Sequence, residues 1–184
     1  ELVDFSPLED EALPENLQGL YLPGGYPELY AEALSQNKSM RESVRKAVIG
    51  GLPCIAECGG FMYLTEAIGD FPMAGALKGG CFDTGKLTRF GYVTLTAQID
   101  NLLCRAGEQI PAHEFHHWDA ETPGEDFRAE KPSGRSWLCA HASKTLYAGF
   151  PHFHFYANPS FAVRFLDACR KESCHAGTNK AHGD

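Results

Sequence analysis

The feature that most constrains this chain is an apolar run that ends at a cysteine and is followed by two glycines. Residues 53–64 read PCIAECGGFMYL, with Cys58 at the corner. A strand that turns sharply into a helix lifts its corner residue out of the backbone, and glycines after the corner allow the tight turn. The helix N-terminus behind Cys58 favours its thiolate form. The segment therefore predicts a cysteine presented to attack a carbonyl carbon.

The residues around this corner alternate between strand-like and helix-like patterns. We expect a strand over 17–22, helices over 27–36 and 39–49, a strand over 54–56 and a helix over 61–68. This order is typical of a parallel sheet with helices on its faces. Gly, Pro and short apolar pieces over 69–136 predict a more antiparallel section, which includes an alternating strand over 90–97.

The C-terminal part predicts a last strand and a last helix. The strand covers 145–150, and the helix covers 159–170 with Phe161, Phe165, Leu166 and Cys169 facing inward. Residues 1–171 are expected to form one domain, because this length supports a single sizeable core. The polar residues 172–184 are expected to form a disordered tail.

Composition excludes several classes of protein. The formal net charge of −8 argues against a general nucleic-acid binder, which needs a basic surface. No apolar run is long enough to span a bilayer, and no signal peptide is visible. The seven cysteines are an odd number, so reduced thiols fit better than a disulfide framework. We expect a cytoplasmic enzyme without nucleic-acid or membrane partners.

Two further turns follow strand-like runs and could join Cys58. Residues 23–25 read PGG, and His152 follows the last predicted strand. In open α/β sheets, ligands bind where the strands end at their carboxyl edge. Backbone N–H groups of Gly24 and Gly25 could then stabilise an oxyanion, while His152 supplies a base. A Cys–His pair at one sheet edge is suited to acyl transfer through a thioester.

Five stretches make the chain resemble a known family, the glutamine amidotransferase domains of cobyrinic acid a,c-diamide synthases. They are FSPL at 5–8 with LP at 13–14, GLYLPGGYPE at 19–28, AECGGFMYL at 56–64, HEFH at 113–116, and HFHF at 152–155 with NP at 158–159. The resemblance implies an α/β, flavodoxin-like three-layer sandwich of the class I glutamine amidotransferase type, with a mostly parallel central sheet.

The resemblance also implies roles for individual residues. Cys58 would attack the side-chain amide of glutamine, and His152 would activate the thiol and protonate the leaving ammonia. Gly24, Gly25 and Gly59 would stabilise the oxyanion through their backbone N–H groups. Other triad amidotransferases carry His-x-Glu, whereas here the corresponding position is His154. The cobyrinic branch of the triad amidotransferases, which this chain resembles, lacks that acid. This leaves open which group orients His152.

A histidine cluster has several interpretations. His113, His116 and His154 are candidates to contact Cys58 or His152 from behind and support them, and the HEFH segment could line the glutamine pocket, face a partner domain or be purely structural. A rival hypothesis treats the cluster as metal ligands, namely His113, Glu114, His116, His117, His152 and His154. The spacing is not HExxH and no cysteine pair accompanies it. We therefore expect no metal site.

The expected partners follow from what the chain does not contain. It has no GxxxxGK[ST] loop, so it should supply ammonia without activating a carboxylate. ATP and Mg²⁺ are expected to bind an N-terminal synthetase domain, and no cofactor is expected in this chain. The expected substrates are glutamine and cobyrinic acid. A homodimer is left open. Three alternatives remain: a nickel-sirohydrochlorin a,c-diamide synthase, a binding module that has lost hydrolysis, and a metal-dependent hydrolase.

Overall fold

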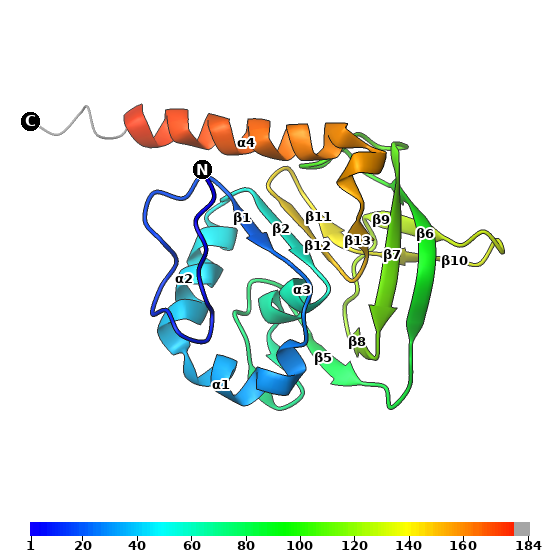
Figure 1. Ribbon diagram of the computed structural model, residues 1–184, viewed down its shortest axis with the longest axis horizontal. Coiled ribbons are helices and arrows are strands. Elements are labelled where there is room, and N and C mark those ends of the chain that lie inside the picture. Colours follow the sequence, from blue (N-terminus) through cyan, green and yellow to red (C-terminus); the bar gives the residue numbers. More distant parts are fainter. Residues whose placement is uncertain (179–184) are drawn as a thin grey trace, which may run out of the picture.

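Three parallel strands form the centre of the fold (Figure 1). The computed structural model describes residues 1–178. The central strands are β1 (Leu20–Leu22), β2 (Cys54–Glu57) and β12 (Leu146–Gly149), and β11 (His141–Ala142) adds an antiparallel edge in the order β1-β2-β12-β11. All four residues of β2 are buried, as expected for a parallel strand covered on both faces.

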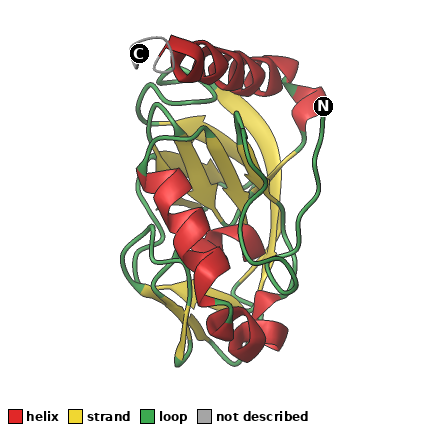
Figure 2. Ribbon diagram, turned by 90° about the vertical axis from the view of Figure 1, so that its left-hand side faces the viewer, coloured by secondary structure: helices red, strands yellow, loops and turns green. Residues whose placement is uncertain are grey.

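Helices cover one face of this central sheet. They are η1 (Pro27–Tyr30), α1 (Ala31–Gln36), α2 (Lys38–Ile49) and α3 (Gly59–Leu64). Figure 2 shows α2 in front of the central strands. The Asn37 side chain caps α2 by accepting a hydrogen bond from the Met40 N–H. Met40, Val44 and Phe61 are fully buried in the core between these helices and the sheet.

A second, antiparallel sheet lies against the other face. Its strand order is β10 (Ser136–Cys139), β9 (Phe127–Glu130), β6 (Arg89–Ala97), β7 (Gln109–His116) and β13 (His152–Phe153). Alternate residues of β7 are buried, so one face of the sheet points inward. Ile55 and Tyr147 of the central sheet pack into this second core, and Phe161 of α4 (Pro159–Thr178) joins them.

Smaller elements complete the described part of the chain. A mixed four-stranded sheet has the order β4 (Phe71–Pro72), β3 (Ala67–Ile68), β5 (Gly80–Asp83) and β8 (Trp118–Ala120), and η2 (Phe155–Ala157) leads into α4. α4 runs along the top of the molecule in Figure 1. Within the residues that the structure describes, no helix combines the length and the apolar character needed to cross a membrane.

The α/β class, the parallel central strands and the antiparallel middle section are confirmed, with three corrections. The helix expected over 61–68 ends at Leu64, because Thr65 is extended and its hydroxyl donates to the Met62 carbonyl. Leu166 is 51% exposed and does not face inward. α4 continues past Arg170 to Thr178, since the sequence has no proline or glycine between Ser160 and Ala176. The predicted tail 172–184 thus begins inside a helix, and 179–184 lie outside the described residues.

Candidate active site

Cys58 forms the corner between β2 and α3, as the sequence predicts. Its backbone has φ of 49° and ψ of −104°, a conformation that non-glycine residues rarely adopt. Such a residue costs about 1–3 kcal/mol and persists only where its surroundings hold it. Here the Cys58 N–H donates to the Gly149 carbonyl at 2.8 Å, and its own carbonyl accepts from the Met62 N–H at 2.9 Å. The corner is therefore fixed by β12 on one side and by α3 on the other.

The two glycines after the corner let α3 approach the end of β1. A Cβ atom at Gly60 would overlap the carbonyl oxygen of Leu22, and the Gly60 N–H donates to the Pro23 carbonyl. A Cβ atom at Gly59 would lie 2.8 Å from the Gly25 carbonyl oxygen. Only glycine fits at both positions. The turn that follows β1 is thereby brought against the residue that follows the nucleophile.

His152 reaches this corner from the antiparallel sheet. It lies on β13 and pairs in register with His113 of β7. The two imidazole rings stack, with their centroids 4.9 Å apart and an interplanar angle of 16°. A Cβ atom at Gly24 would overlap Cε1 of the His152 ring, so the ring lies directly against this glycine. Gly24, Gly25, Gly59 and His152 therefore surround Cys58.

The electrostatics of the site favour a protonated His152. The neighbouring Cys58 sulfur, followed by the Glu57 carboxylate, raises the pKa of His152 from 6.5 to about 9, against the opposing effect of burial. The imidazole is therefore a cation at neutral pH, and it lies beside the Cys58 sulfur. An imidazolium–thiolate pair is the state that a cysteine acyl-transfer site requires.

Burial dominates the environment of the other four buried thiols. Burial raises the pKa of Cys54, Cys81 and Cys139 to about 12, and that of Cys104 to about 11. A thiol with so high a pKa is protonated at neutral pH and is a poor nucleophile. Unlike these four, Cys58 lines a hollow and lies beside His152.

Glu57 is a site residue that the sequence reasoning missed. Its side chain is 4% exposed, and its Oε2 lies 3.8 Å from His152 Nδ1. Oε1 accepts the Phe153 N–H at 2.9 Å, and Oε2 accepts the Tyr21 hydroxyl at 2.7 Å. The sequence did contain a sign of this role, because Glu57 is a lone carboxylate at the end of an otherwise apolar strand. Ionisable residues in such positions are almost always paired.

A small hollow lies beside Cys58. Its volume is about 30 Å³, close to the space of one water molecule, so neighbouring side chains must move before a larger molecule enters. Glu28 contributes a carboxylate oxygen, Oε2, that is buried without a hydrogen-bond partner among the described residues. Burial raises the pKa of this carboxyl. The lining residues are Gly25, Tyr26, Glu28, Cys58, Met62, Phe115, His116, His117 and Trp118.

The HEFH segment contributes to the site from β7. His116 lines the hollow, stacks on Phe150 with centroids 3.9 Å apart, and hydrogen-bonds the Trp118 carbonyl through Nδ1. Burial lowers the pKa of His116 and also that of His113. Both imidazoles are therefore neutral at neutral pH. His116 thus shares the hollow with Cys58, whereas His113, on the opposite face of β7, stacks on His152.

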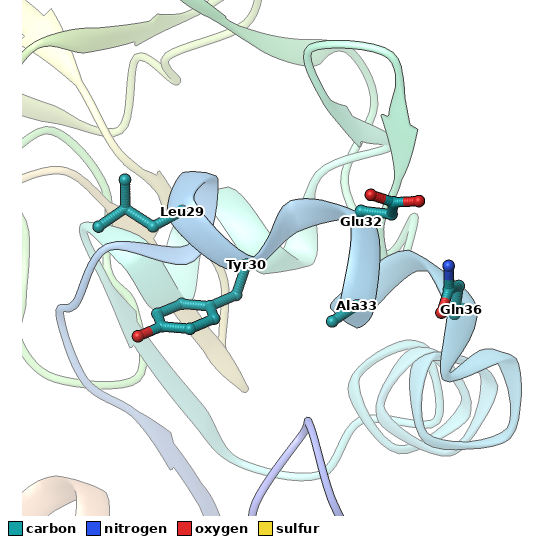
Figure 3. Close-up of a pocket in the computed structure, with 5 residues that line it drawn as sticks. All are labelled: Leu29, Tyr30, Glu32, Ala33 and Gln36. Atoms are coloured by element: carbon teal, nitrogen blue, oxygen red, sulfur yellow. The ribbon is translucent and has the colours of Figure 1, made fainter.

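Other predicted features lie apart from this centre. His154 is exposed, and its ring contacts Tyr156. Figure 3 shows a separate, open hollow on η1 and α1, whose five lining residues include neither a cysteine nor a histidine. Among the described residues, no group of three or more His, Cys, Asp or Glu side chains is placed to hold a metal ion.

Comparison with known proteins places the chain among glutamine amidotransferases. The sequence model of the CobB/CobQ-like glutamine amidotransferase domain matches residues 1–160. Cobyrinate a,c-diamide synthases of Caldanaerobacter subterraneus subsp. tengcongensis and Clostridium acetobutylicum are 40% and 39% identical over 91% and 88% of this chain. Hydrogenobyrinate a,c-diamide synthase of Streptomyces coelicolor is 37% identical over 92% of it. The matches span 39%, 38% and 35% of these relatives' own lengths.

Proposed function

Because this chain belongs to the family of CobB/CobQ-like glutamine amidotransferase domains, we propose that Cys58 and His152 hydrolyse glutamine to glutamate and ammonia. One observation carries the proposal: Cys58 stands at a strained strand–helix corner beside a histidine whose pKa is raised to about 9. A binding module without catalysis would not need a nucleophile held in this conformation next to a cation.

The first half of the reaction forms a thioester. The Cys58 thiolate attacks the side-chain carboxamide carbon of glutamine, and the carbonyl oxygen becomes an oxyanion. The N–H groups of Gly24, Gly25 and Gly59 are the proposed donors to that oxygen; removing one such donor typically costs about 3 kcal/mol of barrier. The C–N bond then breaks, and the His152 imidazolium gives its proton to the leaving nitrogen, which departs as ammonia.

The second half releases glutamate. The His152 imidazole, now neutral, takes a proton from a water molecule that attacks the thioester carbon. The C–S bond breaks, and the departing thiolate is again paired with the His152 imidazolium. The sum of both halves is glutamine plus water giving glutamate plus ammonia, with the enzyme unchanged.

We propose a biosynthetic use for the ammonia, which rests on the names of the relatives. Two of the three relatives described above are cobyrinate a,c-diamide synthases, and the match covers about two fifths of their length. In this proposal, ammonia passes to a separate synthetase domain that binds ATP and Mg²⁺ and amidates the a and c carboxylates of cobyrinic acid. The relative from Streptomyces coelicolor supports hydrogenobyrinate as a second candidate acceptor.

The experiment uses the full-length protein with ATP, Mg²⁺ and either acceptor. We expect glutamine-dependent diamide formation by the wild type and its loss in Cys58→Ala. The same variant should still form the diamide from ammonium chloride, because the synthetase half does not need Cys58. Glutamine-dependent amidation by Cys58→Ala would refute the glutaminase role, and comparing cobyrinate with hydrogenobyrinate decides between the two acceptors.

A second arm compares ammonia release by the 184-residue chain and by the full-length protein. We expect the chain alone to be weakly active, because uncoupled hydrolysis wastes glutamine and such sites are usually controlled by their acceptor domain. Equal rates in both proteins, unaffected by ATP or acceptor, would contradict this control.

A further inference from the structure

We propose that Glu57 is the positioning residue that orients His152 and stabilises its protonated form, in place of the acid that other triad amidotransferases carry two residues after the histidine. The proposal rests on the function proposed above and names a residue of that same site. It places the acid directly before the nucleophile in sequence, on a different strand from the histidine.

The Glu57 carboxylate is held in one orientation. Glu57 ends β2, where it pairs in register with Gly149 of β12. Its Oε1 accepts the N–H of Phe153, the residue after His152, and its Oε2 accepts the Tyr21 hydroxyl. Two donors from opposite sides fix the plane of the carboxylate. The contact to Phe153 also fixes β13 relative to β2, and therefore fixes His152 relative to Cys58.

The His152 imidazole directs one of its ring nitrogens toward Glu57. Glu57 Oε2 lies 3.8 Å from His152 Nδ1, which is within ion-pair distance but longer than a hydrogen bond. Catalytic hydrogen bonds are often this long in the absence of substrate and shorten in the reacting complex. With Nδ1 toward Glu57, the other ring nitrogen is available to exchange a proton with the thiol and the leaving ammonia.

The tyrosines and histidines around Glu57 and His152 are neutral. The titratable groups that face it are Tyr21 on β1, Cys58 at the corner, His113 and His116 on β7, and Tyr147 on β12. Burial raises the pKa of both tyrosines and lowers that of both histidines, so these four groups carry no charge at neutral pH. Among the described residues, Glu57 therefore supplies the carboxylate that faces His152, next to the Cys58 sulfur.

A purely structural alternative must be separated from this role. Glu57 could act only as a link between β1 and β13, through its contacts with Tyr21 and Phe153. Glu57→Gln is nearly isosteric and retains an acceptor oxygen for the Phe153 N–H, but it removes the charge. Tyr21→Phe does the reverse, because it removes one link and leaves the charge in place.

The decisive measurement is the pKa of His152 in the full-length protein, read by NMR with labelled histidine and assigned by comparison with His152→Asn. An opposite charge at this distance shifts a pKa by about one unit or more, so we expect Glu57→Gln to lower the pKa of His152 by that amount. Glu57→Asp should lower it less. Glu114→Gln is the matched control, since Glu114 is also a buried strand carboxylate, and it should leave the His152 titration unchanged.

Kinetics give an independent readout. Glutamine hydrolysis needs the imidazolium, so its rate falls as pH rises through the pKa of His152. Glu57→Gln should move this alkaline limb to lower pH by about one unit and reduce kcat with little change in KM. If the wild-type protein releases no ammonia, the proposed function fails, whereas the NMR titration still tests the positioning role.

Two results would overturn the proposal. One is a folded Glu57→Gln protein whose His152 titrates as in the wild type. If Glu57→Gln does not fold, the variants Tyr21→Phe and Glu57→Asp provide the test. The proposal requires the pKa of His152 to stay raised in Tyr21→Phe and to fall part of the way in Glu57→Asp. The opposite order would assign Glu57 a structural role only.

Discussion

Gly24→Ala should strongly reduce glutamine hydrolysis, because the added methyl group would occupy space that the His152 ring fills. A Cβ atom at Gly24 would overlap Cε1 of that ring and lie 3.2 Å from each ring nitrogen. Restoring an ordinary carbon–carbon separation of about 3.5 Å requires the ring to move by roughly 1 Å. The stacked His113 ring restricts the directions in which it can move.

The expected size of the effect follows from this displacement. Misplacing a reacting group by about 1 Å can cost about 100-fold in rate, which corresponds to about 2.7 kcal/mol of activation free energy. We therefore expect kcat/KM for ammonia release to fall about 100-fold in the full-length Gly24→Ala protein. Thermal unfolding measured alongside should show that the fold is retained.

Gly25→Ala is the matched comparison, since the two glycines are neighbours in one turn. A Cβ atom at Gly25 would have no heavy atom within 4 Å, so its loss of activity should stay below about tenfold. Similar losses in the two variants would refute the reasoning, because the effect could then not come from displacement of His152.

Three further predictions concern the same centre. A chloroketone or diazo analogue of glutamine should label Cys58 before Cys54 or Cys81, because burial raises the pKa of those two thiols to about 12. Peptide mass spectrometry identifies the labelled cysteine. If Cys54 or Cys81 is labelled first, Cys58 is not the nucleophile. His152→Ala should reduce thioester formation by about 100-fold or more, and His154→Ala should have a milder effect. A quenched labelling assay measures both variants. A larger loss in His154→Ala than in His152→Ala would make His154 the base. The pKa of His152 is raised in the folded protein from 6.5 to about 9, so its contribution to stability is fully present below pH 6.5 and is lost as pH rises through about 9. Glutaminase activity should fall over the same alkaline range. A pH–rate profile that stays flat to pH 10 would contradict this prediction.

The local parts of the site could be predicted from the sequence. Residues 53–64 carry both the apolar strand and the glycines of the turn, so the corner at Cys58 depends on neighbours that the pattern displays. Glu57 could not be assigned in this way. Its partner, His152, comes from a distant part of the chain, and their contact depends on how β2, β12 and β13 are placed relative to one another. Sequence patterns predict strands but do not specify which residues of two strands lie opposite each other.

The same limitation applies to the histidines of β7. The HEFH motif shows that histidines are present, but the pairing of His113 with His152 results from the register between β7 and β13. The burial of Glu114, which raises the pKa of its carboxyl to about 7, likewise reflects packing between two sheets. Side chains that alternate along one strand thus have different environments, which only the tertiary structure separates.

The nucleophile and its base belong to different sheets: Cys58 follows β2 of the parallel sheet, whereas His152 lies on β13, which pairs with β7 of the antiparallel sheet. The distance between the two groups is therefore a measure of how the sheets are aligned. The hydrogen bond from the Phe153 N–H to Glu57 Oε1 joins β13 to the end of β2, so the two sheets share a fixed point directly beside the nucleophile. A substitution that separates the two sheets at this point would therefore part the base from the nucleophile without altering either residue.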